Sequence, residues 1–183
     1  MSAIKTLATT EVYRNKWMRL REDKILRADG NEGIYSVVEK ADFVVVIARE
    51  GDSLYVVEQF RYPLGKHTIE LPQGAWECAP QADPLRVAAG ELREETGLVA
   101  GKIRHVGYQK LAQGYSSQGY HIFLAEELVH QQQELDPEEF GLTTRKITLR
   151  EFETLICEGK ISDATSVTAY LLAKLKGMLD MLE

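Results

Sequence analysis

The chain has 183 residues, a length that suits one domain with a small additional sheet. Hydrophobic residues make up 44% and charged residues 27%, the values of an ordinary globular protein. The net charge of −6 argues against a nucleic-acid-binding surface, which would be basic, but not against a phosphate substrate, because metal ions and a few arginines supply local positive charge.

The number of cysteines and the lengths of the apolar segments indicate in which cellular compartment the protein is expected. Cys78 and Cys157 are too few for a disulfide framework and do not have the spacing of a metal site. We find no signal-peptide pattern and no apolar run long enough to cross a bilayer. We therefore expect a cytoplasmic protein with free thiols and no membrane partner.

Alternating apolar and polar residues predict strands in the first two thirds of the chain. Residues Val12 to Val38 alternate around an Asp29-Gly30-Asn31 turn, which indicates a hairpin. A continuous apolar run from Phe43 to Ala48 fits a buried strand. Three further segments have strand character: Leu54 to Phe60, Ile103 to Leu111 and Tyr120 to Ala125.

Three helices are expected. The first begins after Asp83, a favourable N-cap, and ends at Gly97, which suits a left-handed C′ position. A Thr148/Glu151 capping box precedes a helix through Cys157, and a last helix opens near Asp163. Strands interspersed with so few helices predict an α/β fold with a mixed sheet between helices, not a doubly wound parallel sheet.

The first helix carries Glu91, Glu94 and Glu95 on one stripe. Like charges at this spacing weaken a helix unless a cation lies against them. Mg²⁺ is a good candidate, because it takes carboxylate oxygens and then holds substrate phosphates. On its own, the stripe is more often a solvated acidic surface.

The residues on either side favour the metal interpretation. Upstream, the segment from Ile69 to Glu77 leads an apolar stretch into a turn at Pro72 and Gly74. Together with residues Glu91 to Leu98, this order resembles the Nudix hydrolase signature. The resemblance implies an α/β/α sandwich that binds Mg²⁺, or Mn²⁺, through Glu91, Glu95 and the backbone carbonyl of Gln73, with Glu94 beside them.

The chain departs from this signature at two positions. The family's arginine before the first helix glutamate is Gly90 here, and its loop glutamate aligns with Ala82. A helical glycine costs roughly 1 kcal/mol relative to alanine. We hypothesise that the guanidinium of Arg93 enters the space left by Gly90 and that Glu77 replaces the missing carboxylate.

Further features resemble the ADP-ribose pyrophosphatase branch of this family. Residues 1–40 would form an N-terminal sheet and a dimerisation element, and residues 41–183 the Nudix domain. The segment Gln59-Phe60-Arg61-Tyr62 implies that Arg61 binds substrate, and Glu70 would face the nucleoside or ribose. Arg61 could equally be exposed or paired at a subunit interface, and Glu70 could be a surface or turn residue.

The loop Ala112 to Gln118 weakens the substrate assignment. Members of the branch carry a proline and a glutamate where this chain has Gln113 and Gln118. The loop still has the polar composition of a binding loop, so Gln118 is a candidate substrate-binding residue. His121 could also contact a ligand, although a satisfied strand histidine is the preferred interpretation.

The implied activity is metal-dependent hydrolysis of a diphosphate linkage in ADP-ribose or a related nucleotide sugar, by a homodimer. Glu139, with Glu138 next, would act as general base or extra ligand, although such a loop is often only solvated. Two alternatives stay open: a weak or inactive Nudix domain that binds nucleotides, and a Nudix enzyme for another substrate such as a dinucleoside polyphosphate. The N-terminal strands could also be covered within one chain.

Overall fold

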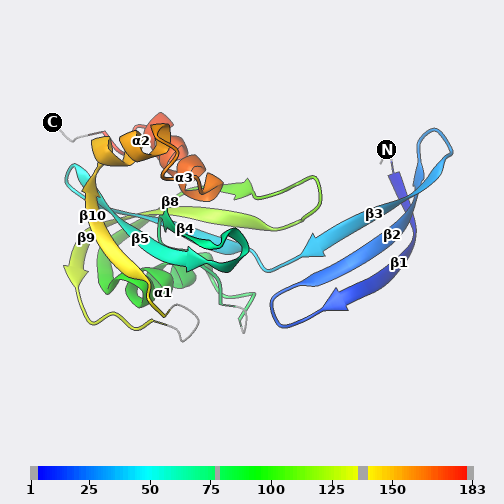
Figure 1. Cartoon of the computed structure of the whole chain (residues 1–183), viewed down its shortest axis with the longest axis horizontal. Coiled ribbons are helices and arrows are strands. Elements are labelled where there is room, and N and C mark those ends of the chain that lie inside the picture. Colours follow the sequence, from blue (N-terminus) through cyan, green and yellow to red (C-terminus); the bar gives the residue numbers. More distant parts are fainter. Residues whose placement is uncertain (1–3, 77–78, 136–139, 181–183) are drawn as a thin grey trace.

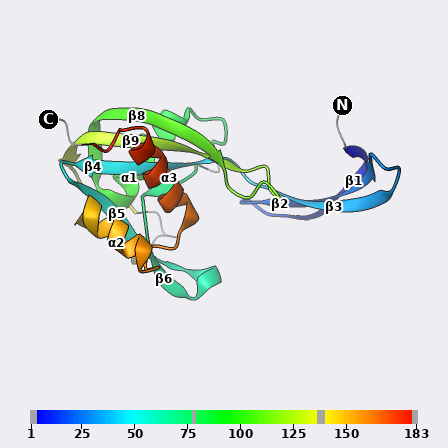
Figure 2. The same ribbon diagram turned by 90° about the horizontal axis from the view of Figure 1, so that it is seen from above.

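The computed structural model describes residues 4–76, 79–135 and 140–180. It has two visibly different parts, a three-stranded arm and a larger body in which helices cover a sheet (Figure 1). A view from above shows the same arm projecting from one end of the body (Figure 2). None of the described helices is long and apolar enough to cross a bilayer.

The arm is an antiparallel sheet of β1 (Ile4–Arg14), β2 (Arg19–Arg27) and β3 (Glu32–Glu39) in that order. The predicted hairpin corresponds to β2 and β3, joined at Gly30, whose φ of 85° favours glycine. The strand before Val12 was not predicted, because all the residues of β1 are exposed and its sequence lacks a clear apolar alternation.

The body contains a seven-stranded mixed sheet. Its main path runs β10-β5-β4-β9-β8, and β6 and β7 pair with β5 and β4. β4 and β9 are parallel neighbours, whereas the other pairs are antiparallel. The strand bounds are Phe43–Glu50 (β4), Ser53–Arg61 (β5), Lys66–Glu70 (β6), Gln73–Gly74 (β7), Leu98–Lys110 (β8), Gly119–His130 (β9) and Thr143–Thr148 (β10).

Helices cover both faces of this sheet, so the predicted α/β/α sandwich is present. Helix α1 (Pro84–Thr96) lies on one face, and α2 (Leu149–Cys157) and α3 (Ala164–Leu175) lie on the other (Figure 1). Alternate residues of β4 therefore enter two cores: Val45 contributes to the one that includes Phe152, and Val46 to the one that includes Leu92. Burial on both faces explains the continuous apolar run of β4.

The three helices begin at the predicted residues, and α1 and α2 also end where predicted. The Asp83 carboxylate accepts a hydrogen bond from the Leu85 backbone at 3.0 Å, and Gly97 ends α1 with φ 68°. Thr148 Oγ1 accepts from the Glu151 backbone at 3.0 Å, and Asp163 Oδ2 accepts from the Ser166 backbone at 2.8 Å. These caps satisfy backbone donors that have no partner within the helix.

The loop after β8, which belongs to the body, forms hydrogen bonds with the last strand of the arm. The Val38 backbone donates to the Tyr115 carbonyl at 2.8 Å, and Ser116 Oγ donates to the Val38 carbonyl at 2.8 Å. Tyr35 Oη donates to the Gly114 carbonyl at 2.6 Å. The loop thus holds β3 against the body near the start of β4.

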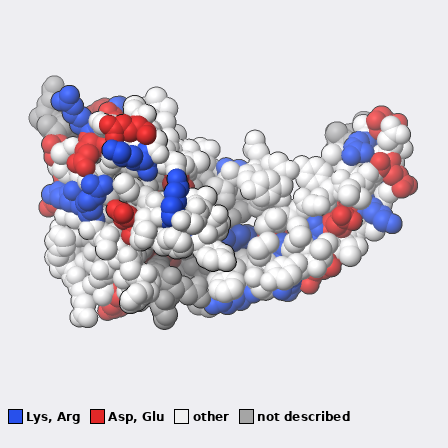
Figure 3. All heavy atoms as spheres, viewed as in Figure 1, with Lys and Arg blue, Asp and Glu red and all other residues white. Residues whose placement is uncertain are grey.

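On the face seen in Figure 3, acidic and basic side chains are interspersed over both the arm and the body.

Candidate active site

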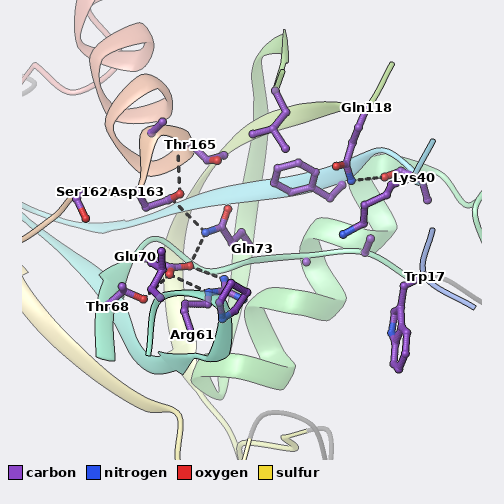
Figure 4. Close-up of a pocket in the computed structure, with 18 residues that line it drawn as sticks. Trp17, Lys40, Arg61, Thr68, Glu70, Gln73, Gln118, Ser162, Asp163 and Thr165 are labelled. Carbon is purple, nitrogen blue, oxygen red and sulfur yellow. Dashed lines mark hydrogen bonds and ion pairs between the residues drawn. The ribbon is translucent and has the colours of Figure 1, made fainter. Parts of the chain in front are cut away.

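A cavity of about 530 Å³ lies where the arm meets the body. Its walls come from distant parts of the chain: Trp17 from the turn between β1 and β2, Arg61 and Glu70 from β5 and β6, Gln73 from β7, and Asp163 from the start of α3 (Figure 4). A cavity of this size is typical of small-molecule sites. The structure thus brings together Arg61, Glu70, Gln73 and Gln118, four residues singled out in the sequence.

Arg61 and Glu70 form a bidentate ion pair in the cavity wall. Arg61 Nε and Nη2 donate to the two Glu70 oxygens at 2.9 and 2.5 Å, and Thr68 Oγ1 donates to Oε1 at 2.6 Å. Burial raises the pKa of the Glu70 carboxyl, but the hydrogen bonds from Arg61 and Thr68 outweigh it, so that this pKa lies below its usual value. The pair with Glu70 therefore fixes the orientation of the Arg61 guanidinium. The Arg61 side chain is still 38% exposed.

Gln73 connects three carboxylates. Its backbone N–H donates to Glu95 Oε2 at 3.0 Å. Its side-chain nitrogen donates to Glu70 Oε2 at 2.7 Å and to Asp163 Oδ2 at 3.2 Å (Figure 4). The residue therefore links the helix glutamates, the ion pair and the N-terminus of α3.

The two helix glutamates that resemblance marks as metal ligands are buried beside this cavity. Glu91 is 5% exposed and Glu95 only 1% exposed. A Cβ on Gly74 would overlap the Glu91 carboxylate, so glycine at 74 permits the close approach of β7 to α1. Glu94 is half-buried on the same helix.

These carboxylates fit a hard divalent cation in their chemistry. Mg²⁺ and Mn²⁺ take oxygen ligands, and Glu91 and Glu95 present carboxylate oxygens on successive turns of α1. Within residues 4–76, 79–135 and 140–180, no group of three or more Asp, Glu, His or Cys side chains is arranged to hold a metal ion. Glu91 and Glu95 are therefore the described residues whose chemistry suits such a cation.

The structure corrects the proposed role of Arg93. Its guanidinium pairs with Glu134 at 2.5 Å and is 44% exposed. The space beside Gly90 is taken by the indole of Trp76, whose Cζ2 a Cβ at position 90 would overlap. Arg93 therefore points away from Gly90, because a partner on the segment after β9 holds it. Glu77, the other proposed replacement, lies outside the described residues.

The acidic segment after β9 runs along the end of α1. The Glu134 backbone donates to the Glu94 carbonyl at 3.3 Å, and the Gln131 backbone donates to the Gly97 carbonyl at 2.6 Å. Glu138 and Glu139 lie outside the described residues. The segment that leads to them, from Gln131 to Glu134, therefore lies next to the end of helix α1, which carries the three glutamates.

Gln118 and His121 have partners within the chain. Gln118 is 7% exposed and lines the cavity, where its side-chain nitrogen donates to the Ala41 carbonyl at 2.6 Å. His121 packs against Tyr108, with ring centroids 4.8 Å apart, and its Nδ1 lies 3.4 Å from His105 Nε2. Burial, and then the proximity of His105, lowers the pKa of His121.

Three further cavity residues were not identified from the sequence. Trp17 was hidden in a turn between strands, Lys40 in the connection from β3 to β4, and Asp163 was recognised only as a helix start. An aromatic residue in a polar turn, as in Asn15-Lys16-Trp17, is the one signal that could have drawn attention to Trp17.

Two protein-family models match this chain. Residues 38–161 match the NUDIX domain, and residues 4–38 match the nucleoside diphosphate sugar hydrolase N-terminal domain. The chain belongs to the Nudix hydrolase family. The sequence-based expectation of an enzyme, a Nudix pyrophosphohydrolase, is thereby confirmed, and hydrolases of this family generally use a divalent metal.

Individual relatives match nearly the whole chain. An ADP-ribose pyrophosphatase of Bacillus subtilis (strain 168) is 29% identical over 178 residues, covering 96% of this chain and 95% of that protein. A methanol dehydrogenase activator of Bacillus methanolicus is 29% identical over 168 residues, covering 90% and 89%. The crystal structure of an ADP compounds hydrolase shares the fold, with a TM-score of 0.85, 17% identity and coverage of 97% and 96%.

Proposed function

We propose that this Nudix hydrolase cleaves the diphosphate linkage of a nucleoside diphosphate sugar, with ADP-ribose as the first candidate, in the presence of Mg²⁺ or Mn²⁺. The observation that carries the proposal is the position of the buried Glu91 and Glu95 directly behind Gln73 and Gly74, which line the nucleotide-sized cavity. The B. subtilis relative named ADP-ribose pyrophosphatase supports this substrate.

The residues of α1 and β7 would hold the cation. Glu91 and Glu95, with Glu94 beside them and the backbone carbonyl of Gln73, supply the oxygen ligands. When bound, a divalent cation polarises a diphosphate and lowers the pKa of a water. Glu139, or Glu138 next to it, is proposed as the general base or as an extra ligand.

Substrate binding is assigned to the cavity wall. The ion pair with Glu70 holds the guanidinium of Arg61 in a fixed orientation, in which it can donate to a phosphate oxygen. Lys40 adds a second positively charged side chain to the cavity wall, and Gln118 lines the cavity on the side next to the arm. These residues orient the substrate and reduce its contact with water.

We also propose that the protein is a homodimer in which residues 1–40 form the interface. The arm projects from the body (Figures 1 and 2) and leaves large apolar side chains exposed on β1 and β3, such as Val12 at 59% and Ile34 at 60%. Exposed apolar side chains on edge strands favour pairing with a second copy. Light scattering at micromolar concentration tests this, and a monomer would contradict it.

A substrate screen tests the activity. The purified protein is incubated with Mg²⁺ or Mn²⁺ and ADP-ribose, other nucleoside diphosphate sugars and dinucleoside polyphosphates, and the release of nucleoside monophosphate is measured. We expect ADP-ribose to rank first and Glu95→Gln to lower kcat by about 100-fold or more, as for loss of a charged catalytic group. An ADP-ribose rank below every other compound would overturn the substrate assignment.

A nucleotide-binding module with weak or no turnover is the second candidate function. Gly90 and Ala82, in place of the family's arginine and loop glutamate, and Gln113, in place of the branch's proline, favour it. Tight binding of ADP-ribose without metal-dependent turnover would establish this function. Metal-dependent turnover that is lost in Glu95→Gln would exclude it.

A further inference from the structure

The orientation of the Gln73 amide is determined by its neighbours. Its nitrogen donates to Glu70 Oε2 at 2.7 Å and to Asp163 Oδ2 at 3.2 Å. The reverse orientation would place the amide oxygen against two carboxylates, without any donor between them. The nitrogen must therefore face Glu70 and Asp163.

The two carboxylates are themselves held in place and cannot turn away from Gln73. Glu70 is 3% exposed and is bound by Arg61 and Thr68. Asp163 caps α3, where it accepts from the backbone and the hydroxyl of Ser166 at 2.8 and 2.6 Å. Both anchors come from elements in the body, so the amide is fixed from two sides.

The fixed nitrogen determines what Gln73 offers to a ligand. Its amide oxygen is the other polar atom of the fixed amide and points away from Glu70, and the residue lines the cavity (Figure 4). An amide oxygen can only accept hydrogen bonds, and the neighbouring Glu70 and Asp163 oxygens are acceptors as well. This part of the wall therefore suits a hydroxyl donor and disfavours a phosphate oxygen.

We propose that Gln73 is a specificity-determining residue whose amide oxygen accepts a hydrogen bond from a sugar hydroxyl of the substrate. The proposal rests on the function proposed above and adds to it a side-chain role for Gln73. The hydroxyl belongs either to the nucleoside ribose or to the sugar on the far side of the diphosphate, because both carry the same donor.

The test uses Gln73→Met, which keeps the volume of the side chain and the backbone bond to Glu95 but removes the amide. The matched control is Gln132→Met, whose side chain is exposed on the segment after β9. Steady-state kinetics compare ADP-ribose, an ADP methyl ester without the distal sugar, and a 2′,3′-dideoxyadenosine analogue of ADP-ribose. Calorimetry with ADP-ribose in EDTA gives a second readout that needs no turnover, and thermal melts check folding.

We expect Gln73→Met to raise KM for ADP-ribose about three- to tenfold, the effect of one neutral hydrogen bond, with the main change in KM and not in kcat. Binding in EDTA should weaken by the same factor, and Gln132→Met should match the wild type. The penalty should disappear for the one analogue that lacks the recognised hydroxyl, which identifies the sugar.

Three outcomes would overturn the proposal: an equal penalty on all three esters, no penalty on any, or unchanged binding in EDTA. Gln73→Glu provides a second variant. It places a carboxylate against Glu70 and Asp163 and should weaken ADP-ribose binding more than Gln73→Met does; equal or tighter binding would contradict the fixed orientation. If the wild type cleaves none of the compounds, the proposed function fails, and calorimetry still decides the role of Gln73 separately.

Discussion

Replacing Gly90 with alanine should destabilise this protein, although the same change stabilises most helices. Gly90 lies inside α1, where alanine is normally favoured by about 1 kcal/mol. Here the added Cβ would overlap Cζ2 of Trp76 and lie 3.1 Å from Cε2 of the same ring. A rigid indole can relieve this overlap only by moving as a whole, so the substitution should force Trp76 away from the helix.

The magnitude follows from two opposing terms. Overpacking of this kind costs about 1–3 kcal/mol. After the helix-propensity gain of about 1 kcal/mol, the free energy of unfolding of Gly90→Ala should fall by about 0–2 kcal/mol. Without the indole only the propensity term remains, so Gly90→Ala in a Trp76→Ala background should stabilise the protein by about 1 kcal/mol.

Urea denaturation of the wild type, both single variants and the double variant measures this coupling. A double-mutant cycle isolates the contact between Gly90 and Trp76, because the cost of removing the indole alone cancels. We expect a coupling free energy of about 1–3 kcal/mol and opposite signs for Gly90→Ala in the two backgrounds. Equal stabilisation by Gly90→Ala with and without the indole would refute the steric explanation.

Three other predictions concern stability. Arg49→Met should cost about 2 kcal/mol in urea denaturation, because the buried guanidinium donates to three backbone carbonyls at 2.9–3.1 Å; the exposed Arg145→Met should cost under about 0.5 kcal/mol, and equal costs would contradict this. The pKa of His121 is lower in the folded than in the unfolded protein, so the stability it contributes above about pH 6.5 should be lost as the pH falls through the folded value; a His121→Gln variant with the same slope of unfolding free energy against pH would exclude this cause. Asp163→Ala should cost about 1 kcal/mol through loss of the α3 cap, whereas Asp163→Asn should retain most of it, as thermal melts can show.

Local patterns were sufficient for the helices and for most of the long strands of the body. The caps at Asp83, Thr148 and Asp163 depend on contacts two or three residues away, so the sequence contains both partners. The run from Phe43 likewise identified β4, because a strand buried on both faces has a nearly continuous apolar sequence. Strand β10 was missed, since Thr143 to Thr148 is polar at most positions and its pairing with β5 is a long-range contact.

Only those parts of the candidate site that form a local sequence motif could be predicted from the sequence. The glutamate stripe of α1 and the Nudix signature around it are local in sequence, so they indicated the family and the region where a cation site is proposed. The structure decided that Trp76, not Arg93, fills the space at Gly90, and that the amide of Gln73 reaches Asp163, 90 positions away. Such pairings arise because β7 packs against α1 and lies near the start of α3. A contact between distant segments depends on how layers stack and not on any periodicity within either segment.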